Sequence, residues 1–111
     1  MSNTTKMTSV EQVIASMTNR FNPDACQKIK ANYQWRISGE KGKDFCVAVN
    51  QGAFEIIDGV VTDPSVTFET DADTYLRLVN NELKGMTAIL TRKLQVRGNI
   101  YLAGKMDHIF K

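Results

Sequence analysis

Apolar residues near the start of the chain recur at the spacing of an amphipathic helix. The positions are separated by steps of three or four residues, which places them on one helical face. They are Val10, Val13, Ile14, Met17 and Phe21. Ser9 and Gln12 have the spacing of a capping box, so the pattern predicts a helix that begins after Ser9. Asn22 is placed to cap a second, short turn with Pro23 at its first position.

The period of the apolar pattern changes to two in the middle of the chain, which is typical of β-strands. The alternating positions are Tyr33, Trp35 and Ile37, then Phe45, Val47 and Val49, then Phe54 and Ile56, and finally Val66 and Phe68. Turns at 39–43 and 51–52 separate the first three strands, and 58–59 ends the third. Short connections predict an antiparallel meander, and the break at Asp63-Pro64 precedes a fourth strand.

Helical spacing returns after the fourth strand. The apolar positions are Tyr75, Leu76, Leu78 and Val79 in a helix capped by Asp71, Met86 to Leu90 in a short helix, Leu94 and Val96 in a fifth strand, and Ile100, Leu102, Ala103, Met106, Ile109 and Phe110 in a last helix. This order predicts an α+β fold in which helices cover one face of a five-stranded sheet.

The apolar positions on these helices exceed what one narrow core-facing stripe requires. The helix expected at 86–90 is nearly all apolar, and the last helix is apolar on two sides. Surplus apolar surface must meet something, because exposing it to water is unfavourable. Deep burial, a subunit interface and a bound apolar ligand each meet this requirement, and the pattern alone favours deep burial.

Charge is distributed in blocks of alternating sign along the chain. Residues 1–43 carry a net charge of +4, residues 44–83 carry −7 and residues 84–111 carry +5. Such blocks indicate a polarised surface. A nucleic-acid binder would present a dense and unopposed basic face, so nucleic acid is not an expected partner.

Few residues are suited to catalysis or metal binding. Cys26 and Cys46 form no CxxC motif, and His108 is the sole histidine, so a metal site is not expected. The sequence has no GxSxG, Gly-rich phosphate or HExxH motif. Asp71 and Asp73 lie around a helix start and have the placement of capping residues. We therefore expect no enzymatic activity, no catalytic residue and no cofactor.

The chain has the length of one domain. Its first residues are polar, and no apolar run approaches the roughly 18 residues that span a bilayer. We expect a cytoplasmic protein with a flexible segment at 1–7 and a single domain at 8–111, which contacts membranes at most transiently.

Four stretches, taken in order, resemble the sterol carrier protein 2 family over about residues 9–110. They are Arg20-Phe21-Asn22-Pro23, residues 63–70 (DPSVTFET), the apolar helix within 83–90, and residues 93–99 (KLQVRGN) followed by Leu102-Ala103. The last stretch is the most specific. Its physics agrees, because Lys93, Gln95 and Arg97 would point to one side of a strand while Gly98 and Asn99 supply a turn and a helix cap.

The resemblance implies a mixed five-stranded sheet, helices over one face, and an apolar tunnel between the two layers. Members of that family bind sterols, fatty acids, acyl-CoA or isoprenoid-like molecules there. The candidate lining residues are Trp35, Phe45, Val47, Phe54, Phe68, Tyr75, Leu76, Val79, Met86, Ile89, Leu90, Thr91, Leu102, Met106 and Phe110. Arg92, Arg97 and Lys105 are candidates for the rim, where they would meet a carboxylate or phosphate head group.

Several positions depart from the family pattern. Ile89, Leu90 and Thr91 replace a Phe-Phe-Gln stretch that lines the family's cavity, and Arg92 replaces a glycine. The smaller side chains leave more room and change the polar contact. Gly104 stands where the family often has methionine, and it would give either extra space in the tunnel or a flexible lid.

The resemblance implies non-enzymatic binding or carriage of a fatty acid, acyl-CoA, sterol-like or isoprenoid molecule. Two alternatives remain open: an accessory module that presents a lipid-like intermediate to a partner enzyme, and an interaction or dimerisation domain with a filled core. An empty enclosed tunnel is costly, so we expect the unliganded protein to close or to retain lipid. The last helix with Phe110 is the expected gate, because a terminal helix can move without disturbing the sheet.

Overall fold

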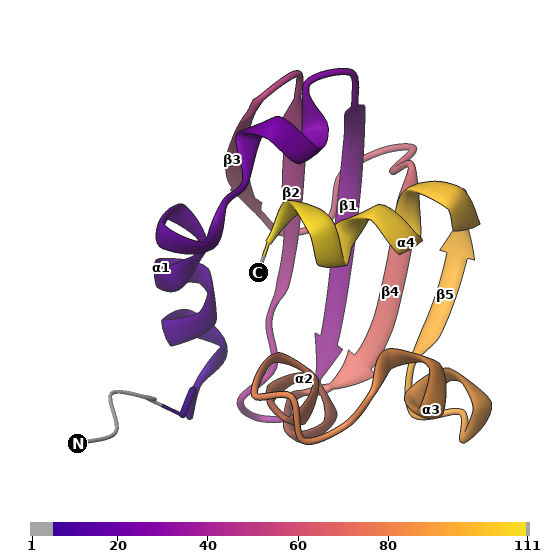
Figure 1. The fold of residues 1–111 in the computed structure, drawn as a ribbon. Coiled ribbons are helices and arrows are strands. Elements are labelled where there is room, and N and C mark those ends of the chain that lie inside the picture. Colours follow the sequence, from indigo (N-terminus) through magenta and orange to yellow (C-terminus); the bar gives the residue numbers. More distant parts are fainter. Residues whose placement is uncertain (1–5, 111) are drawn as a thin grey trace.

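A computed structural model describes residues 6–110 of the 111-residue chain (Figure 1). Its helices and strands follow the order that the apolar pattern predicts. They are α1 (Val10–Arg20), the short 3-10 helix η1 (Pro23–Cys26), β1 (Lys30–Ser38), β2 (Asp44–Asn50), β3 (Ala53–Asp58), β4 (Val66–Asp71), α2 (Ala72–Val79), α3 (Gly85–Leu90), β5 (Gln95–Gly98) and α4 (Ile100–Ile109). No helix in this part of the chain is long and apolar enough to cross a membrane.

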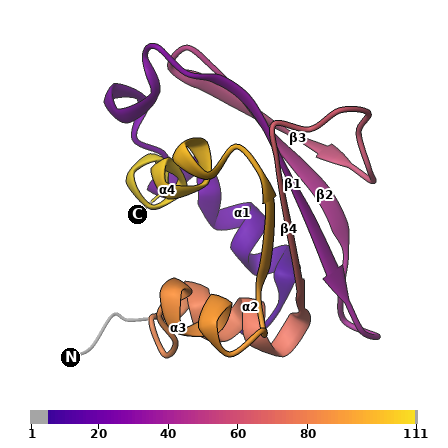
Figure 2. The same ribbon diagram turned by 90° about the vertical axis from the view of Figure 1, so that its right-hand side faces the viewer.

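The five strands form one mixed sheet in the order β3-β2-β1-β4-β5. β1, β2 and β3 form the expected antiparallel meander, and β5 pairs antiparallel with β4. β1 and β4 are parallel, with Trp35 opposite Phe68. Figure 2 shows the helices on one side of the sheet, as predicted. The side chains of β1 and β4 therefore form the middle of the face that the helices cover.

Alternating residues of β1 build the centre of the core. Tyr33, Trp35 and Ile37 are at most 8% exposed. The buried residues of α1 are Val10, Val13 and Met17, which all belong to the predicted apolar face. Packing of this face against the sheet supplies most of the stability of α1, because an isolated helix of this length is marginal in water.

Gln34 is a polar residue that the strand alternation places on the outer face of the sheet, yet it is only 1% exposed. Its amide nitrogen donates to the carbonyl oxygens of Phe45 and Gly59, at 3.1 and 3.0 Å. Its amide oxygen accepts from the Val61 N–H at 2.9 Å. The Gln34 side chain therefore fixes the connection between β3 and β4 against the outer face.

Three helices begin with the side-chain caps that the sequence predicts. Ser9, Asp71 and Asn99 each accept a hydrogen bond from the backbone N–H three residues later, at 2.8–3.1 Å. At Asp71 this bond holds the pKa of the carboxyl below its usual range. Asn22 makes no side-chain cap bond, so the cap predicted there is wrong. Pro23 at the start of η1 has no N–H that needs a partner.

The first turn of α4 is attached to the sheet by a tyrosine. The Tyr33 hydroxyl on β1 donates to the Leu102 carbonyl oxygen at 2.8 Å. Burial, and secondarily the charge of the Cys26 thiol, raises the pKa of Tyr33 to about 12. The phenol therefore stays protonated and keeps this hydrogen bond over the whole neutral range.

The C-terminal end of α4 is attached to the end of α1. The Asn22 N–H donates to the Ile109 carbonyl oxygen at 2.7 Å. The Phe110 ring packs against the rings of Phe21 and Phe54, with centroid distances of 5.5 and 5.1 Å. These contacts count against the expectation that the last helix is the gate, which hydrogen exchange can test.

The expected flexible segment, residues 1–7, falls mostly outside the described residues, which begin at Lys6. Lys6 forms an ion pair with Glu82 at 2.8 Å. The Met7 backbone exchanges two hydrogen bonds with the Asn80 side chain, at 2.7 and 2.9 Å. These contacts connect the residues before α1 to the C-terminal end of α2.

Replacing Tyr33 with phenylalanine removes the hydrogen bond to α4 and leaves the Leu102 carbonyl without its partner. We expect the free energy of unfolding to fall by about 1–2 kcal/mol, measured by urea denaturation. Tyr101→Phe is the matched control, because the Tyr101 side chain is 70% exposed. It should change stability by less than about 0.5 kcal/mol. Equal effects of the two substitutions would contradict the attachment of α4 through Tyr33.

Candidate functional site

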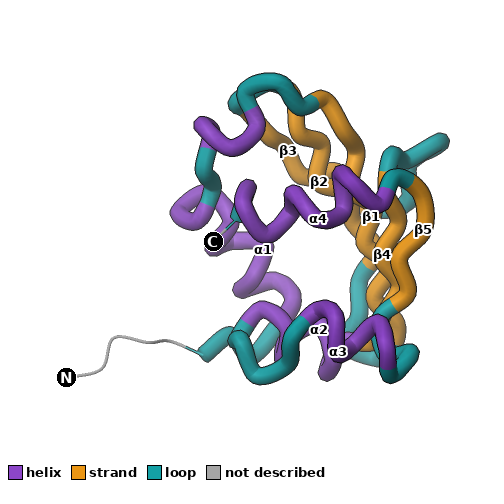
Figure 3. The backbone as a smooth tube through the Cα atoms, turned by 45° about the vertical axis from the view of Figure 1, so that its right-hand side comes forward, coloured by secondary structure: helices purple, strands orange, loops and turns teal. Residues whose placement is uncertain are grey.

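A hollow of about 1430 Å³ lies between the inner face of the sheet and the helices. β1 and β4 contribute its floor, α2 and α3 one wall, and α4 the opposite wall. Figure 3 shows α4 facing α2 and α3 across this space. Met86, Ile89 and Ile100 line the hollow and are 40–66% exposed, so it opens to solvent beside α3 and the start of α4. We call this hollow the apolar groove; an enclosed tunnel stays a prediction.

Aromatic rings form the floor of the apolar groove. Trp35 stacks on Phe68 with a centroid distance of 4.3 Å, and Tyr75 meets the Trp35 ring edge-on at 4.8 Å. All three residues are at most 8% exposed. The buried Trp35 Nε1 has no hydrogen-bond partner among the described residues. The floor is thus a packed aromatic surface that offers apolar contact to anything in the groove.

Eight of the predicted lining residues lie in the apolar groove. They are Trp35, Phe68, Tyr75, Val79, Met86, Ile89, Met106 and Phe110. They come from β1, β4, α2, α3, α4 and the residue after α4, so the fold brings together positions that are far apart in the sequence. Seven further apolar residues line the groove and were not predicted to do so. They are Met17, Leu78, Leu83, Leu94, Val96, Ile100 and Ala103.

Seven predicted lining residues lie outside the apolar groove. They are Phe45, Val47, Phe54, Leu76, Leu90, Thr91 and Leu102. Phe45 and Val47 are fully buried in the core, and Phe54 packs between Phe21 and Phe110. Leu90 is 76% exposed on the solvent side of α3. Neighbouring residues of a helix point in different directions, so Ile89 and Leu90 could not both face the groove.

Positive charge dominates the rim of the apolar groove. The charged residues that line it, within the described part of the chain, are Arg20, Lys84, Arg92, Arg97 and Asp107. Arg92 and Arg97 belong to the predicted rim. Lys105, the third predicted rim residue, lies outside the groove, and its ammonium sits over the Tyr101 ring at 5.1 Å from the centroid. The excess of cations suits a ligand with an anionic end.

Arg20 and Tyr75 place polar groups beside the aromatic floor. Arg20 is the last residue of α1, and its Nε donates to the Ser16 hydroxyl at 3.0 Å. Burial raises the pKa of the Tyr75 phenol, and the Arg20 charge acts in the opposite direction. The phenol therefore stays protonated at neutral pH. No sequence signal identified Arg20, because the packing of α1 beside α2 is what brings it to the groove.

Gly104 gives the apolar groove extra space. It lies on one stripe of α4 with Ile100, Ala103 and Asp107, and all four residues line the groove. A Cβ atom at Gly104 would meet no heavy atom within 4 Å. Because α4 is attached to β1 and to the end of α1, the contacts favour space over the alternative of a flexible lid.

α3 is the most exposed wall of the apolar groove. Ala88 is its one buried residue, while Met86 is 66% exposed. Asn81 before α3 and Arg92 after it have φ angles of 61° and 62°. This left-handed conformation costs a residue such as Arg92 roughly 1–2 kcal/mol, whereas asparagine adopts it with less strain. Arg92 thus holds strained backbone at the groove rim, where the family resemblance implies glycine.

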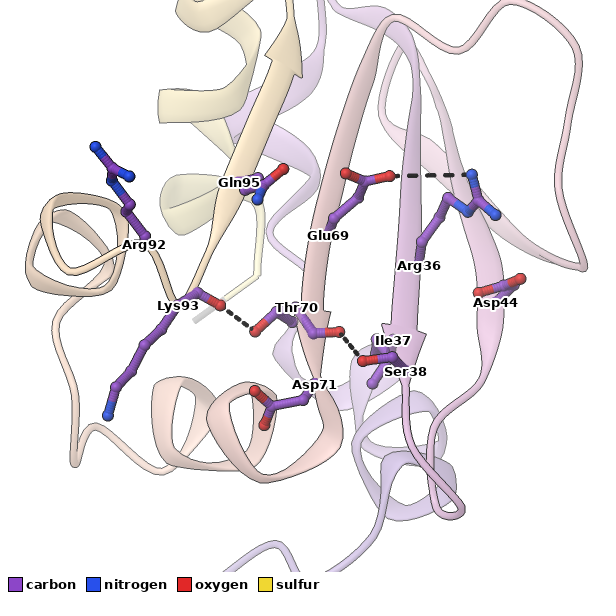
Figure 4. Close-up of a pocket in the computed structure, with 10 residues that line it drawn as sticks. All are labelled: Arg36, Ile37, Ser38, Asp44, Glu69, Thr70, Asp71, Arg92, Lys93 and Gln95. Carbon is purple, nitrogen blue, oxygen red and sulfur yellow. Dashed lines mark hydrogen bonds and ion pairs between the residues drawn. The ribbon is translucent and has the colours of Figure 1, made fainter.

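Figure 4 shows a second, polar hollow of about 720 Å³ where β1, β4 and β5 lie side by side. Glu69 forms ion pairs with Arg36 at 3.9 Å and with Arg97 at 3.4 Å. The Thr70 hydroxyl donates to the Lys93 carbonyl oxygen at 2.8 Å. These contacts join the three strands and pair Arg36, Glu69 and the Thr70 hydroxyl within the protein.

The apolar groove contains few groups that could take part in a reaction. Among the described residues, no three His, Cys, Asp or Glu side chains gather in a way that could hold a metal ion. Asp107 is the one carboxylate of the described part that lines the groove. Cys26 and Cys46 are buried free thiols, and burial raises the pKa of Cys46. The arrangement suits binding.

Replacing Arg92 with glycine relieves the left-handed strain after α3. We expect the free energy of unfolding to rise by about 1 kcal/mol in urea denaturation, because glycine adopts this conformation freely. Lys93→Gly is the matched control: it adds the same backbone freedom where φ is not positive, and should lower stability by about 0.5–1 kcal/mol. A loss of stability in Arg92→Gly would mean that the Arg92 side chain holds α3 in place.

Two solved structures share this fold. Palmitated SCP2L2 from Aedes aegypti is 24% identical, with a TM-score of 0.75 over 92% of this chain and 94% of that chain. A variant of the sec-alkyl sulfatase PisA1, an enzyme from a Pseudomonas species, is 14% identical, with a TM-score of 0.83. The match covers 94% of this chain and 16% of the sulfatase. The α+β architecture therefore occurs both alone and as a part of a longer chain.

The match to a relative in sequence also covers only part of a longer chain. Hydroxysteroid dehydrogenase-like protein 2 from Bos taurus is 24% identical over 102 residues, which are 91% of this chain and 24% of the relative. This chain thus spans about a quarter of the length of that relative. Residues 10–111 match the SCP-2 sterol transfer family, nearly from one end of the chain to the other. The order of strands and helices agrees with this match, and the chain belongs to the SCP-2 sterol transfer family.

Proposed function

We propose that this protein binds and carries a fatty acid, acyl-CoA, sterol-like or isoprenoid molecule in the apolar groove, without converting it chemically. Membership of the SCP-2 sterol transfer family supports a role in lipid binding or transfer. The observation that carries the proposal is the groove, in which Trp35 and Phe68 form an apolar floor. Its volume of about 1430 Å³ exceeds the roughly 300–1,000 Å³ of common small-molecule sites.

Burial of an acyl chain would drive binding. Each buried methylene contributes about 0.8 kcal/mol, so a chain of about 15 methylenes gains on the order of 12 kcal/mol before costs. Ordering the chain and immobilising the ligand remove a large part of this gain. We therefore expect micromolar or tighter affinity, which suits a carrier that must also release its ligand.

The charges of the groove orient the ligand in this proposal. Arg92 and Arg97 lie at the rim, and Arg20 lies beside the aromatic floor. A carboxylate or phosphate can accept charge-assisted hydrogen bonds from a guanidinium group. The protonated phenol of Tyr75 is a further donor. The apolar part of the ligand then lies along Phe68 and α4, away from water.

We infer that α3 is the wall that opens to load the ligand. α4 is held by the Tyr33 hydroxyl in its first turn and by the Phe110 ring at its C-terminal end. α3 buries Ala88 alone and is flanked by two left-handed residues, Asn81 and Arg92. Segments with few buried contacts open at the lowest free energy.

Gly104→Phe places a ring in the apolar groove, where the glycine leaves open space. We expect this variant to lose most uptake of a fluorescent long-chain fatty acid, measured by titration. It should remain folded, because glycine is the poorest helix former apart from proline. Circular dichroism and thermal unfolding verify the fold.

Two control variants separate filling of the groove from other effects. Gly104→Ala adds a single carbon and should retain uptake. Leu90→Glu adds a charge on α3 outside the groove and should also retain it. Normal uptake by folded Gly104→Phe would place the ligand elsewhere, and the absence of uptake by the wild-type protein would count against lipid carriage.

Hydrogen exchange measures the proposed opening of α3 in the unliganded protein. The N–H groups of Ala88 in α3 and of Thr91 directly after it, and those of Ala103 in α4 and of Phe110 directly after it, each donate to the carbonyl oxygen four residues earlier at 3.0–3.1 Å. We expect the α3 pair to exchange at least about tenfold faster than the α4 pair, because less burial resists the opening of α3. Faster exchange in α4 would instead indicate that the last helix is the gate.

A further inference from the structure

Exposed apolar side chains gather beside the opening of the apolar groove. Seven large apolar side chains are exposed in the described part of the chain, and five of these belong to α3 or to the first turn of α4. They are Met86, Ile89, Leu90, Ile100 and Tyr101. Figure 1 shows both elements at the β5 edge of the sheet. Single exposed apolar residues are ordinary, but a gathering of them marks a surface that meets a partner or a membrane.

The same stretch of the chain is strongly cationic. Residues 84–106 contain five Lys or Arg residues and no Asp or Glu, whereas residues 44–83 carry a net charge of −7. Arg97 pairs with Glu69. The other four cations, Lys84, Arg92, Lys93 and Lys105, form no ion pair with any described residue. Lys93 lies near Asp71, whose pKa its charge helps to lower, and the Lys105 ammonium lies over the Tyr101 ring. None of the four charges is held in an ion pair by a described residue, so they can also meet anions outside the protein.

We propose that residues 84–93 and 100–105 form a docking face that binds reversibly to bilayers containing anionic phospholipids. Cations near an anionic bilayer surface lower the free energy of binding, and exposed apolar side chains insert at the boundary of head groups and acyl chains. Tyr101 suits this boundary because its ring is apolar and its hydroxyl polar. The inference goes beyond ligand carriage, since docking requires no ligand.

Charge decides between a bilayer and a second copy of this chain. Two copies that met through this face would bring like charges together without carboxylates to pair them. Anionic phospholipid head groups supply the opposite charge and also an apolar layer for Leu90 and Met86, which are 76% and 66% exposed.

Flotation with lipid vesicles tests the docking face directly. The unliganded wild-type chain should float with vesicles of phosphatidylcholine containing about one third phosphatidylserine, and not with phosphatidylcholine alone. The double variant Leu90→Glu/Tyr101→Glu should lose this binding. Lys93→Gln and Lys105→Gln should each weaken it by about fivefold, and added salt should weaken the wild-type interaction.

Val60→Glu is the matched control, because Val60 is 58% exposed on the connection between β3 and β4, remote in sequence from the docking face. It should bind vesicles as the wild type does. The Leu90→Glu/Tyr101→Glu variant should still take up fluorescent fatty acid in solution, since neither residue lines the groove. Flotation of a wild-type chain that takes up no fatty acid would argue against ligand carriage and leave docking intact. Undiminished flotation of this variant, or no flotation of the wild type, would overturn the docking face.

Discussion

The hydrogen bond between the Tyr33 hydroxyl and the Leu102 carbonyl is the contact on which the groove depends. Tyr33 rises from the centre of the sheet, and its ring is fully buried. A buried phenol without a partner is costly, so α4 is held at the height at which the hydroxyl meets its carbonyl. The Phe110 ring fixes the other end of α4 against Phe21. α4 therefore crosses above the sheet without settling on it, and the space beside β4 stays open.

α3, the wall of the groove opposite α4, is held more weakly. α3 contributes one buried residue to the core, and the residue after it, Arg92, adopts a left-handed conformation. Both features lower the free energy needed to displace α3, whereas the attachments of α4 raise it for that helix. A carrier needs one fixed wall to shape its site and one weak wall to admit the ligand. The strained backbone at Arg92 lowers stability next to α3, and backbone strain of this kind is generally found at functional sites.

The sequence was sufficient for the elements and for most helix caps, since these depend on residues close together in the chain. Ser9, Asp71 and Asn99 cap their helices as expected. The residues that line the groove were harder to predict from the sequence. The nearly all-apolar helix α3 has no polar stripe that shows which side faces the core. Ile89 and Leu90 were therefore both assigned to the lining, although only Ile89 lies in the groove.

Contacts between distant parts of the chain explain the other differences. Arg20 reaches the groove because α1 packs beside α2, and nothing in its sequence neighbourhood signals this. Gln34 alternates as an outward polar residue, but the connection after β3 folds over it and buries its amide. The attachment of Phe110 to Phe21 joins residues near opposite ends of the chain. The position of the last helix near the chain terminus did not indicate that both of its ends are held by such contacts.

The opening of the groove changes the energetic argument for a bound lipid. A dry, enclosed void costs about 24 cal/mol for each Å³, which a domain of this size could not sustain for a volume of about 1430 Å³. An open groove admits water, so the unliganded protein need not collapse or retain lipid. Water over Trp35 and Phe68 is nevertheless unfavourable, and replacing it with an acyl chain would drive the proposed uptake. Because the opening, the cations without an ion pair and most of the exposed apolar side chains lie within residues 84–105, contact with a bilayer and exchange of that water for lipid would occur at the same surface.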